Sequence, residues 1–305
     1  MKAAQFHPYP PSYWDAEASE WDRTVAMPTN PHQFYYNEAD LLISEILTES
    51  MQVLELGCGT GGSTAIHARE VRQLLATDFS GEMVRRTARK FRRRRASAPH
   101  FAAADACHLP FRDGSFDAVM SRGVLLSYVK DPKVMLAEVH RVLRLGGRLG
   151  LDAMNRMREG TPRFSRGFCM VADKPCYVEF FVRAGRQVRL VFALSEGSPH
   201  AQLARQGREC ERRPRNLRKY VASEKRYEGR LFEPRELTEL LRGARFRDVR
   251  IIPLGHLAYS LGWKDENIRR FVSASRKDLS KLILRLSEHL RPETALHLFI
   301  TASRS

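Results

Sequence analysis

The stretch QVLELGCGTGG, residues 52–62, decides the fold of this chain. Its first half, Gln52 to Leu56, is largely apolar and predicts a short strand buried within a sheet. Four glycines follow, at positions 57, 59, 61 and 62. Because glycine has no side chain, such a loop lets backbone amides approach a ligand closely. A helix-forming run, Ser63 to Arg72, comes next, and this order of strand, glycine loop and helix is typical of a site for a nucleotide-type cofactor.

Outward from this loop, the chain alternates between strand-like and helix-like patterns. Further strands are predicted at residues 74–77, 100–104, 116–120, 148–152, 248–253 and 295–302, and helices at 39–47, 80–94, 134–145, 234–241 and 268–286. Strands that alternate with helices at this spacing form a parallel sheet with helices on both faces. We therefore expect an α/β fold with a doubly wound, mostly parallel, seven-stranded sheet.

Two regions depart from this alternation. The N-terminal region is rich in aromatic residues and proline, and Trp14 and Trp21 are seven residues apart, which places both on one helical face. Residues 177–184 and 187–194 alternate apolar and polar around a turn and predict an inserted β-hairpin. The expected organisation is an aromatic-rich cover at 1–38, a core at 39–155, an inserted substrate, lid or dimerisation region at 156–230, and the second part of the core at 231–305.

The charge of the chain is concentrated in two stretches. The 305 residues carry a formal net charge of +16, of which +8 falls between Arg85 and Arg95 and +6 between Ala201 and Arg230. Clustered basic residues attract nucleic acid, anionic lipid or acidic substrates, and they also occur as solvated faces without a partner. The sequence leaves both interpretations open.

Cysteine usage and hydropathy indicate the cellular compartment in which the chain is expected. The five cysteines include no C-x-x-C pair, so we expect free thiols and no metal site. No apolar stretch approaches the roughly 18 residues that a membrane-spanning helix needs. Residues 1–13 contain prolines and a histidine where a signal peptide needs an apolar run, so a cytoplasmic protein is expected.

The glycine loop taken alone fits two kinds of cofactor. Gly57, Gly59 and Gly62 have the G-x-G-x-x-G spacing of a dinucleotide site, and Asp78 follows about 20 residues later, where a ribose-binding acid belongs. A nicotinamide-dependent oxidoreductase is therefore one interpretation. Two features favour another cofactor: Glu55, two residues before the first glycine, and an Asp105-Ala106 pair that precedes the strand at 116–120.

With these features, the chain resembles the class I S-adenosylmethionine-dependent methyltransferases. The motifs VLELGCGTGG, ATDFSGEM, AADACHLPFRDGSFDAVMS and VHRVLRLGGRLGLD occur in the order of that family, and the resemblance resumes at LFEPRELTELLRGARFRDVRIIPLG. It is similar to the small-molecule branch that includes the quinone-biosynthesis methyltransferases. The resemblance implies a Rossmann-like fold, S-adenosylmethionine as cofactor, S-adenosylhomocysteine as product, and methyl transfer to an oxygen, nitrogen or carbon atom of a small molecule.

The resemblance also implies where the cofactor binds. The implied binding residues are Glu55, Gly57, Cys58, Gly59, Gly61, Asp78, Phe79, Met83, Asp105, Ala106 and Ser121. The glycine loop and the acid at the end of its strand would hold the methionine end, and Asp78 would accept both ribose hydroxyls. Phe79 and Met83 would pack on the adenine, and Asp105 would accept its amine. Ser121 would face the methionine part through its backbone, while a small side chain is required at Cys58.

Catalytic residues are harder to assign. Ligands of open parallel sheets bind beyond the carboxyl ends of the strands, which selects Tyr128, Asp152 and His256 as candidates. Each has a structural alternative, respectively a core aromatic, a strand-end cap and a loop histidine. Holding the acceptor and the methyl group in line supplies much of the rate of such a transfer, so a dedicated base is optional.

Besides the nicotinamide-dependent oxidoreductase, two other functions stay open at this point. The Arg-rich stretches suit an RNA methyltransferase, although the fourth strand ends in Ser121-Arg122-Gly123-Val124 and not in the N-P-P-aromatic motif of base-amine methyltransferases. A non-catalytic cofactor-binding scaffold is a second alternative, and the basic helix at 268–286 lying on an anionic membrane is a variant of it. The inserted region is also a candidate dimer contact.

Overall fold

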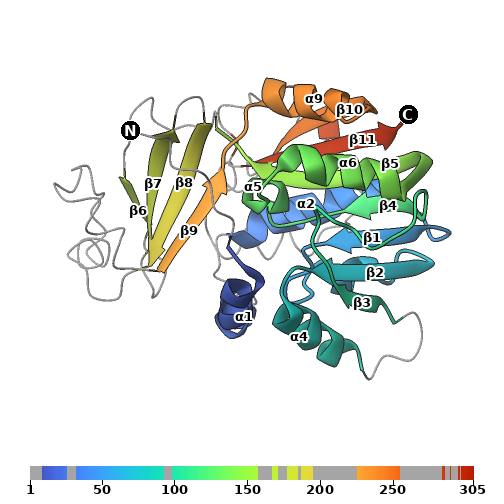
Figure 1. Ribbon diagram of the computed structural model, residues 1–305, viewed down its shortest axis with the longest axis horizontal. Coiled ribbons are helices and arrows are strands. Elements are labelled where there is room, and N and C mark those ends of the chain that lie inside the picture. The colour runs from blue at the N-terminus through green and yellow to red at the C-terminus, as the bar shows by residue number, and fades with distance from the viewer. Residues whose placement is uncertain are drawn as a thin grey trace.

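The computed structural model describes residues 9–25, 32–92, 98–156, 167–170, 177–184, 187–194, 225–254, 284–285, 289, 295 and 297–305. Seven strands of this described part form the main sheet, in the order β10-β11-β5-β4-β1-β2-β3 (Figure 1). Their bounds are β1 Gln52–Leu56, β2 Gln73–Asp78, β3 His100–Ala103, β4 Phe116–Met120, β5 Leu143–Met154, β10 Phe246–Leu254 and β11 His297–Arg304. The first five are parallel, and β11 runs antiparallel to both β5 and β10. The predicted mostly parallel seven-stranded sheet is therefore confirmed.

Helices cover both faces of this sheet. Their bounds are α1 Pro11–Val25, α2 His32–Ile46, α3 Thr64–His67, α4 Gly81–Phe91, α5 Leu125–Tyr128, α6 Pro132–Val142 and α9 Pro234–Gly243. Successive strand residues point to opposite faces, so Leu54 packs with α6 and α9 while Val53 packs with α2 and α4. The two faces thus bury two separate hydrophobic clusters, as a doubly wound sheet requires.

Several element boundaries differ from the sequence-based prediction. Helix α6 begins at Pro132 and not at Val134, because the Asp131 side chain accepts hydrogen bonds from the amides of Lys133 (2.9 Å) and Val134 (3.3 Å) and caps the helix. It ends at Val142, where the chain turns directly into β5, five residues before the predicted strand.

The other differences are also at the ends of elements. The helix predicted over residues 63–72 is reduced to α3, and the one predicted to reach residue 94 ends at Phe91. The strand predicted at 295–302 is β11, shifted by two residues. Most of the helix predicted at 268–286 lies outside the described residues.

A second sheet is inserted between β5 and α9. It is antiparallel, with the order β6-β7-β8-β9, and comprises β6 Gly167–Met170, β7 Tyr177–Ala184, β8 Gln187–Leu194 and β9 Lys225–Arg230. The predicted hairpin is confirmed as β7 and β8, with a further strand on each side of it. Strand β9 passes close to the carboxyl end of β5, since a Cβ added at Gly229 would lie 2.8 Å from Met154 Sδ and 3.4 Å from a ring carbon of Tyr128. The second sheet therefore stands at one end of the main sheet, beside α5 (Figure 1).

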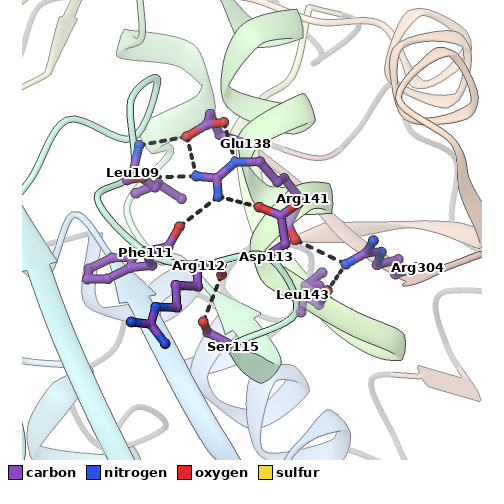
Figure 2. A network of polar contacts seen from close by, with 9 residues as sticks. All are labelled: Leu109, Phe111, Arg112, Asp113, Ser115, Glu138, Arg141, Leu143 and Arg304. Atoms are coloured by element: carbon purple, nitrogen blue, oxygen red, sulfur yellow. Dashed lines mark hydrogen bonds and ion pairs between the residues drawn. The ribbon is translucent and has the colours of Figure 1, made fainter.

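A cluster of polar contacts ties the loop before β4 to α6 (Figure 2). Arg141 Nη1 donates to the carbonyl of Phe111 (2.6 Å) and to Asp113 (2.8 Å), and Nη2 donates to the carbonyl of Leu109 (2.9 Å). Nε and Nη2 each donate to Glu138 at 2.8 Å. Arg304, on the last strand, donates to the carbonyls of Arg141 (3.0 Å) and Leu143. The cluster fastens a long connection to the sheet.

Candidate functional site

A cavity of about 610 Å³ opens at the carboxyl ends of the parallel strands. It is lined by the glycine loop after β1, the end of β2, the loop after β3, the segment after β4, and aromatic residues from the N-terminal helices. Eight of the predicted cofactor residues line it: Gly57, Cys58, Gly59, Asp78, Phe79, Met83, Asp105 and Ala106. Glu55, Gly61 and Ser121 are not among its lining residues.

The glycine loop has a backbone conformation that requires glycine. Gly57, Gly59 and Gly61 have φ angles of +67°, +53° and +88°, in the region that residues with a side chain rarely adopt. A Cβ at Gly61 would in addition lie 2.6 Å from Cγ2 of Thr87 on α4. The Cys58 amide donates to the carbonyl of Thr77 on β2 (2.8 Å) and holds the loop against the sheet. Burial raises the pKa of the Cys58 thiol, so this side chain is neutral. A small neutral side chain fits this position of the loop.

Asp78 joins the loop to the end of β2. Its Oδ2 accepts a hydrogen bond from the Gly59 amide (2.8 Å), and its Oδ1 accepts one from the Ser80 amide (2.9 Å). Burial raises the pKa of Asp78, and the two amide hydrogen bonds oppose that shift. A carboxylate has about four lone-pair sites, so two amide bonds leave acceptor capacity at the cavity, as a pair of ribose hydroxyls needs.

A second acidic group lies on the side of the cavity formed by the loop after β3. Asp105 Oδ1 accepts from the Cys107 amide (2.8 Å), and Oδ2 lies 3.1 Å from Nδ1 of His108. Phe79, which is 39% exposed, and the buried Met83 also line the cavity. Two apolar side chains and an acceptor carboxylate form a suitable wall for a purine ring with an exocyclic amine.

Glu55 and Ser121 support the cavity from within the sheet. Glu55 Oε2 accepts from the Thr64 hydroxyl (2.6 Å), which ties the end of β1 to α3. Burial raises the pKa of Glu55 to about 7, although the Thr64 hydrogen bond lowers it. The Ser121 amide donates to the carbonyl of Gly150 (2.9 Å), and its buried Oγ has no hydrogen-bond partner among the described residues.

The opposite wall of the cavity is aromatic. The rings of Trp14 and Tyr128 meet edge to face with centroids 5.7 Å apart, and those of Trp14 and Trp21 do so at 6.3 Å. A Cβ at Gly59 would lie 3.5 Å from Nε1 of Trp21, so α1 reaches over the glycine loop. Asp15 anchors this helix by accepting from the Ser80 hydroxyl (2.6 Å) and the Glu82 amide (2.9 Å) at the start of α4. The seven-residue spacing of the two tryptophans indicated their common helical face, and the contacts with Tyr128 and Gly59 come from the structure.

The three catalytic candidates have different surroundings. Tyr128 lines the cavity. Asp152 is fully buried and does not line it; its Oδ1 accepts from the Val124 amide (2.8 Å). Val124 has a φ of +60°, which is unusual for a β-branched residue, so Asp152 holds a strained turn directly after the cavity-lining Gly123. His256 lies outside the described residues.

The sequence analysis missed a charged residue that lines the cavity, Arg122. Its Nη1 donates to Asp40 Oδ2 (2.6 Å), and its guanidinium lies over the Tyr36 ring, 4.7 Å from the centroid. Asp40 Oδ1 also accepts from the Ser63 hydroxyl (2.8 Å) and lies 3.2 Å from Nε2 of His67. The signal available was its position directly after the fourth strand, where ligands of such sheets bind.

Two cations share one carboxylate in this buried cluster. Burial alone would lower the pKa of His67, but its hydrogen bonds with Asp40 and Glu70 outweigh burial and raise it to about 9. Burial alone would raise the pKa of Asp40, but the Arg122 charge and the His67 hydrogen bond lower it. At neutral pH Asp40 is therefore a carboxylate held between two cations.

The described residues contain no group of three His, Cys, Asp or Glu side chains that could hold a metal ion. Within the same part of the chain, no helix is long and apolar enough to cross a bilayer. Cys58 and Cys107 are buried free thiols.

The fold and the cavity together define a class of site. A doubly wound sheet with a glycine loop after its first strand, a carboxylate at the end of its second and another after its third is typical of a nucleotide-type cofactor site. The residues present fit S-adenosylmethionine, because the loop is open to backbone contact and Asp78 keeps free acceptor sites. Residues 54–151, about a third of the chain, match the family described as "Methyltransferase domain", and the chain therefore contains a methyltransferase domain.

Individual relatives support this assignment. The chain is 34% identical over 137 residues to the demethylmenaquinone methyltransferase of Thermobifida fusca, covering 45% of this chain and 57% of that protein. It is 36% identical over 95 residues to the malonyl-[acyl-carrier protein] O-methyltransferase of Hamiltonella defensa, covering 31% and 34% respectively. The solved CcbJ methyltransferase from Streptomyces caelestis matches with a TM-score of 0.64 at 14% identity, covering 97% of this chain and 100% of that one. The chain spans about half or less of these curated relatives, and it shares the fold of the solved structure.

Proposed function

We propose that this protein is an S-adenosylmethionine-dependent methyltransferase that acts on a small molecule. The observation that carries the proposal is the cavity, in which the glycine loop and Asp78 face aromatic side chains from α1 and α5. When bound, S-adenosylmethionine supplies an electrophilic methyl group on a positively charged sulfur, and S-adenosylhomocysteine is the product. The protein's own part is to bind, to orient and to exclude water.

Separate residues would serve these tasks. Asp78 and the backbone of the glycine loop would hold the cofactor, with Phe79, Met83 and Asp105 at its adenine. Trp14 and Tyr128 form a wall that excludes water and that an apolar or planar acceptor could pack against. Tyr128 is the described candidate for contact with the acceptor, and Asp152 is a positioning residue that holds the turn at Val124.

The acceptor is proposed to be a small biosynthetic metabolite, with a quinone-type ring as the leading class. The name of the Thermobifida fusca relative points to such a ring. The Hamiltonella defensa relative is named for O-methylation of a malonyl carrier protein, so similar cofactor domains serve different acceptors. The aromatic wall supports a planar acceptor over a hydrophilic one.

We also propose that residues 156–230 shape the acceptor end of the cavity. The support is the close approach of Gly229, on β9, to Met154 and Tyr128. Gly229→Ala should therefore raise KM for the acceptor and leave the affinity for S-adenosylhomocysteine unchanged. An unaltered acceptor KM would contradict this role.

Calorimetric titration of S-adenosylhomocysteine into an Asp78→Asn variant tests the cofactor site. We expect at least about a tenfold loss of affinity, because one acceptor oxygen replaces two. The matched control is Asp113→Asn, whose carboxylate is mostly exposed and outside the cavity. Equal affinity in the two variants would contradict the proposal.

Methyl-labelled S-adenosylmethionine identifies the acceptor class. The protein is incubated with complete or desalted cell extract, and the label is separated into low-mass, RNA and protein fractions. Label in the low-mass fraction that is lost on desalting is the expected result. Label that nuclease releases from RNA would overturn the small-molecule acceptor in favour of the Arg-rich surfaces.

A cytoplasmic location is the final part of the proposal. Two buried free thiols, Cys58 and Cys107, are compatible with a reducing compartment. Fractionation of the source cells should recover the protein with cytoplasmic markers, and recovery with membranes or outside the cell would contradict this location.

A further inference from the structure

Arg122 has more hydrogen-bonding capacity than its own chain uses. A guanidinium has five N–H donors. The described residues give Arg122 one hydrogen-bond acceptor, Asp40, and one ring, Tyr36. Its side chain is 12% exposed and lines the cavity, so its remaining donors are largely removed from bulk water. A buried donor without an acceptor is costly, which favours a ligand that supplies one.

The guanidinium lies against the glycine loop. A Cβ at Gly62 would overlap Nη2 of Arg122, so the absence of a side chain there is what makes room for the guanidinium. The adenine-side residues Phe79 and Asp105 come from the loops after β2 and β3, on the other side of β1 from β4. The segment after β4 therefore places Arg122 on the opposite side of the loop from the adenine.

The charged groups around Arg122 lie behind it and not in the cavity. Asp40 is the acidic partner of Arg122, and it is shared with the protonated His67. Glu70 pairs with the other nitrogen of that imidazole, Nδ1. Glu55 is also buried, and its pKa of about 7 leaves it partly protonated at neutral pH. Of these five groups Arg122 alone lines the cavity, so the group that a ligand meets there is a cation.

A planar fork of N–H donors matches a carboxylate, which it can bind with two parallel hydrogen bonds. S-adenosylmethionine has one carboxylate, at the end of its amino acid part. We propose that Arg122 binds this carboxylate, and that Asp40 and His67 are positioning residues that hold the guanidinium at the glycine loop. The inference rests on the proposed function, because it assumes that this cofactor occupies the cavity.

The test compares two ligands that differ only in the carboxylate: S-adenosylhomocysteine and its decarboxylated analogue, S-adenosyl-3-thiopropylamine. Calorimetry gives the affinity of each for the wild-type protein, Arg122→Met and Arg122→Lys. Arg122→Met should weaken S-adenosylhomocysteine by about thirtyfold, because a charged hydrogen-bonded pair is lost. The same change should weaken the analogue by less than about threefold, and Arg122→Lys should lie between.

The outcomes separate this inference from the proposed function. A wild-type protein that binds neither ligand would contradict the proposed function itself. A wild-type protein that binds both equally well would overturn the role of Arg122 alone, and this comparison needs no variant to fold. An equal loss of both ligands in Arg122→Met would also overturn it, since a merely structural role predicts that result.

The positioning residues are tested by the same pair of ligands. In Asp40→Asn, the preference for S-adenosylhomocysteine over the analogue should fall severalfold, because the guanidinium loses its charged anchor. An unchanged preference, with both affinities reduced alike, would show that Asp40 only stabilises the fold.

Discussion

Two arginines of this protein have opposite relations to their surroundings. Arg141 makes five hydrogen bonds to its own chain, as many as a guanidinium has N–H groups (Figure 2). Arg122 makes one, to Asp40. Yet Arg122 is the more buried, with 12% of its side chain exposed against 31% for Arg141.

The difference separates a structural arginine from a binding arginine. The hydrogen bonds with Glu138 and Asp113 raise the pKa of Arg141, and every donor is used to hold the loop before β4 on α6. Arg122 is anchored by one carboxylate at the edge of a cavity, and its other donors are left for a ligand. A buried cation with unused donors beside a cavity is thus a better sign of a site than charge by itself, as the Arg-rich helix α4 illustrates: Arg85 and Arg86 pair with Glu82 of the same helix.

The largest expected difference between the two arginines is in the free energy of unfolding that is lost when each loses a carboxylate partner. Asp40→Ala leaves Arg122 and His67 as two buried cations without their shared anion, and we expect a loss of about 3–5 kcal/mol in the free energy of unfolding. Asp113→Ala removes an exposed partner of Arg141 and should cost less than about 1 kcal/mol. Urea denaturation at pH 7 measures both, and similar losses would contradict the comparison.

The next largest effect is on the pH dependence of stability, and it should arise in the cluster of Arg122, Asp40 and His67. The pKa of His67 is raised to about 9, so the protonated imidazole stabilises the fold fully below its unfolded pKa and that stability is lost as pH rises through 9. The expected loss between pH 6.5 and 9 is about 3 kcal/mol. His67→Gln should flatten this window.

Glu55→Gln provides the matched control at lower pH. The pKa of Glu55 is raised to about 7, so its contribution is present at pH 4 and lost as pH rises to 7. The substitution should flatten the interval between about pH 4.5 and 7 and leave the interval above it unchanged. Denaturation curves at closely spaced pH values test both, and one variant that alters both intervals would show that the two groups titrate together.

Arg141→Met should have an intermediate effect, confined to stability. Glu138 and the carbonyls of Leu109 and Phe111 lose their donor, but the site is partly exposed and water replaces some of it, so about 2 kcal/mol is expected. The affinity of the folded variant for S-adenosylhomocysteine should be unchanged. Arg235→Met, at an exposed pair with Glu239, is the control and should change neither quantity. Weakened cofactor binding in Arg141→Met would break the distinction between the two arginines.

Gly62→Ala should have the smallest effect, confined to binding. The added methyl group displaces the flexible end of Arg122, so stability should change little while S-adenosylhomocysteine binds about fivefold more weakly, equivalent to about 1 kcal/mol. Gly243→Ala, which adds a methyl group where no atom lies within 4 Å, is the control. Calorimetry and thermal melting together test this, and an unchanged affinity would indicate that Arg122 does not face the cofactor.

The elements and the glycine loop were predictable because their signals are local. Gly57 and Gly59 follow directly after β1, and Asp78 ends β2, so a short motif and the strand order place all three at one edge of the sheet. The ends of elements were less predictable. Helix α6 begins two residues early because Asp131 caps it, and α3 ends at His67, five residues before the predicted end at Arg72.

The other side of the cavity was predictable only in part. The spacing of Trp14 and Trp21 indicated a cover, but not that Trp14 meets Tyr128 or that Trp21 lies over Gly59. Asp152 was predicted to end its strand like a catalytic acid, yet β5 continues to Met154 and Asp152 is fully buried behind the turn at Val124. A strand-end position alone does not tell whether a side chain faces the cavity or the sheet.

The sequence by itself determined the order of strands and helices, the glycine loop and the acid at the end of the second strand, because periodicity and motif spacing depend on neighbouring residues. Only the tertiary structure decided which charges share a site. Asp40 and Arg122 are 82 residues apart, and nothing near either one indicates the other. They meet because α2 and the segment after β4 both pack at the carboxyl edge of the same sheet, and a buried cation must find its counterion wherever the fold brings one.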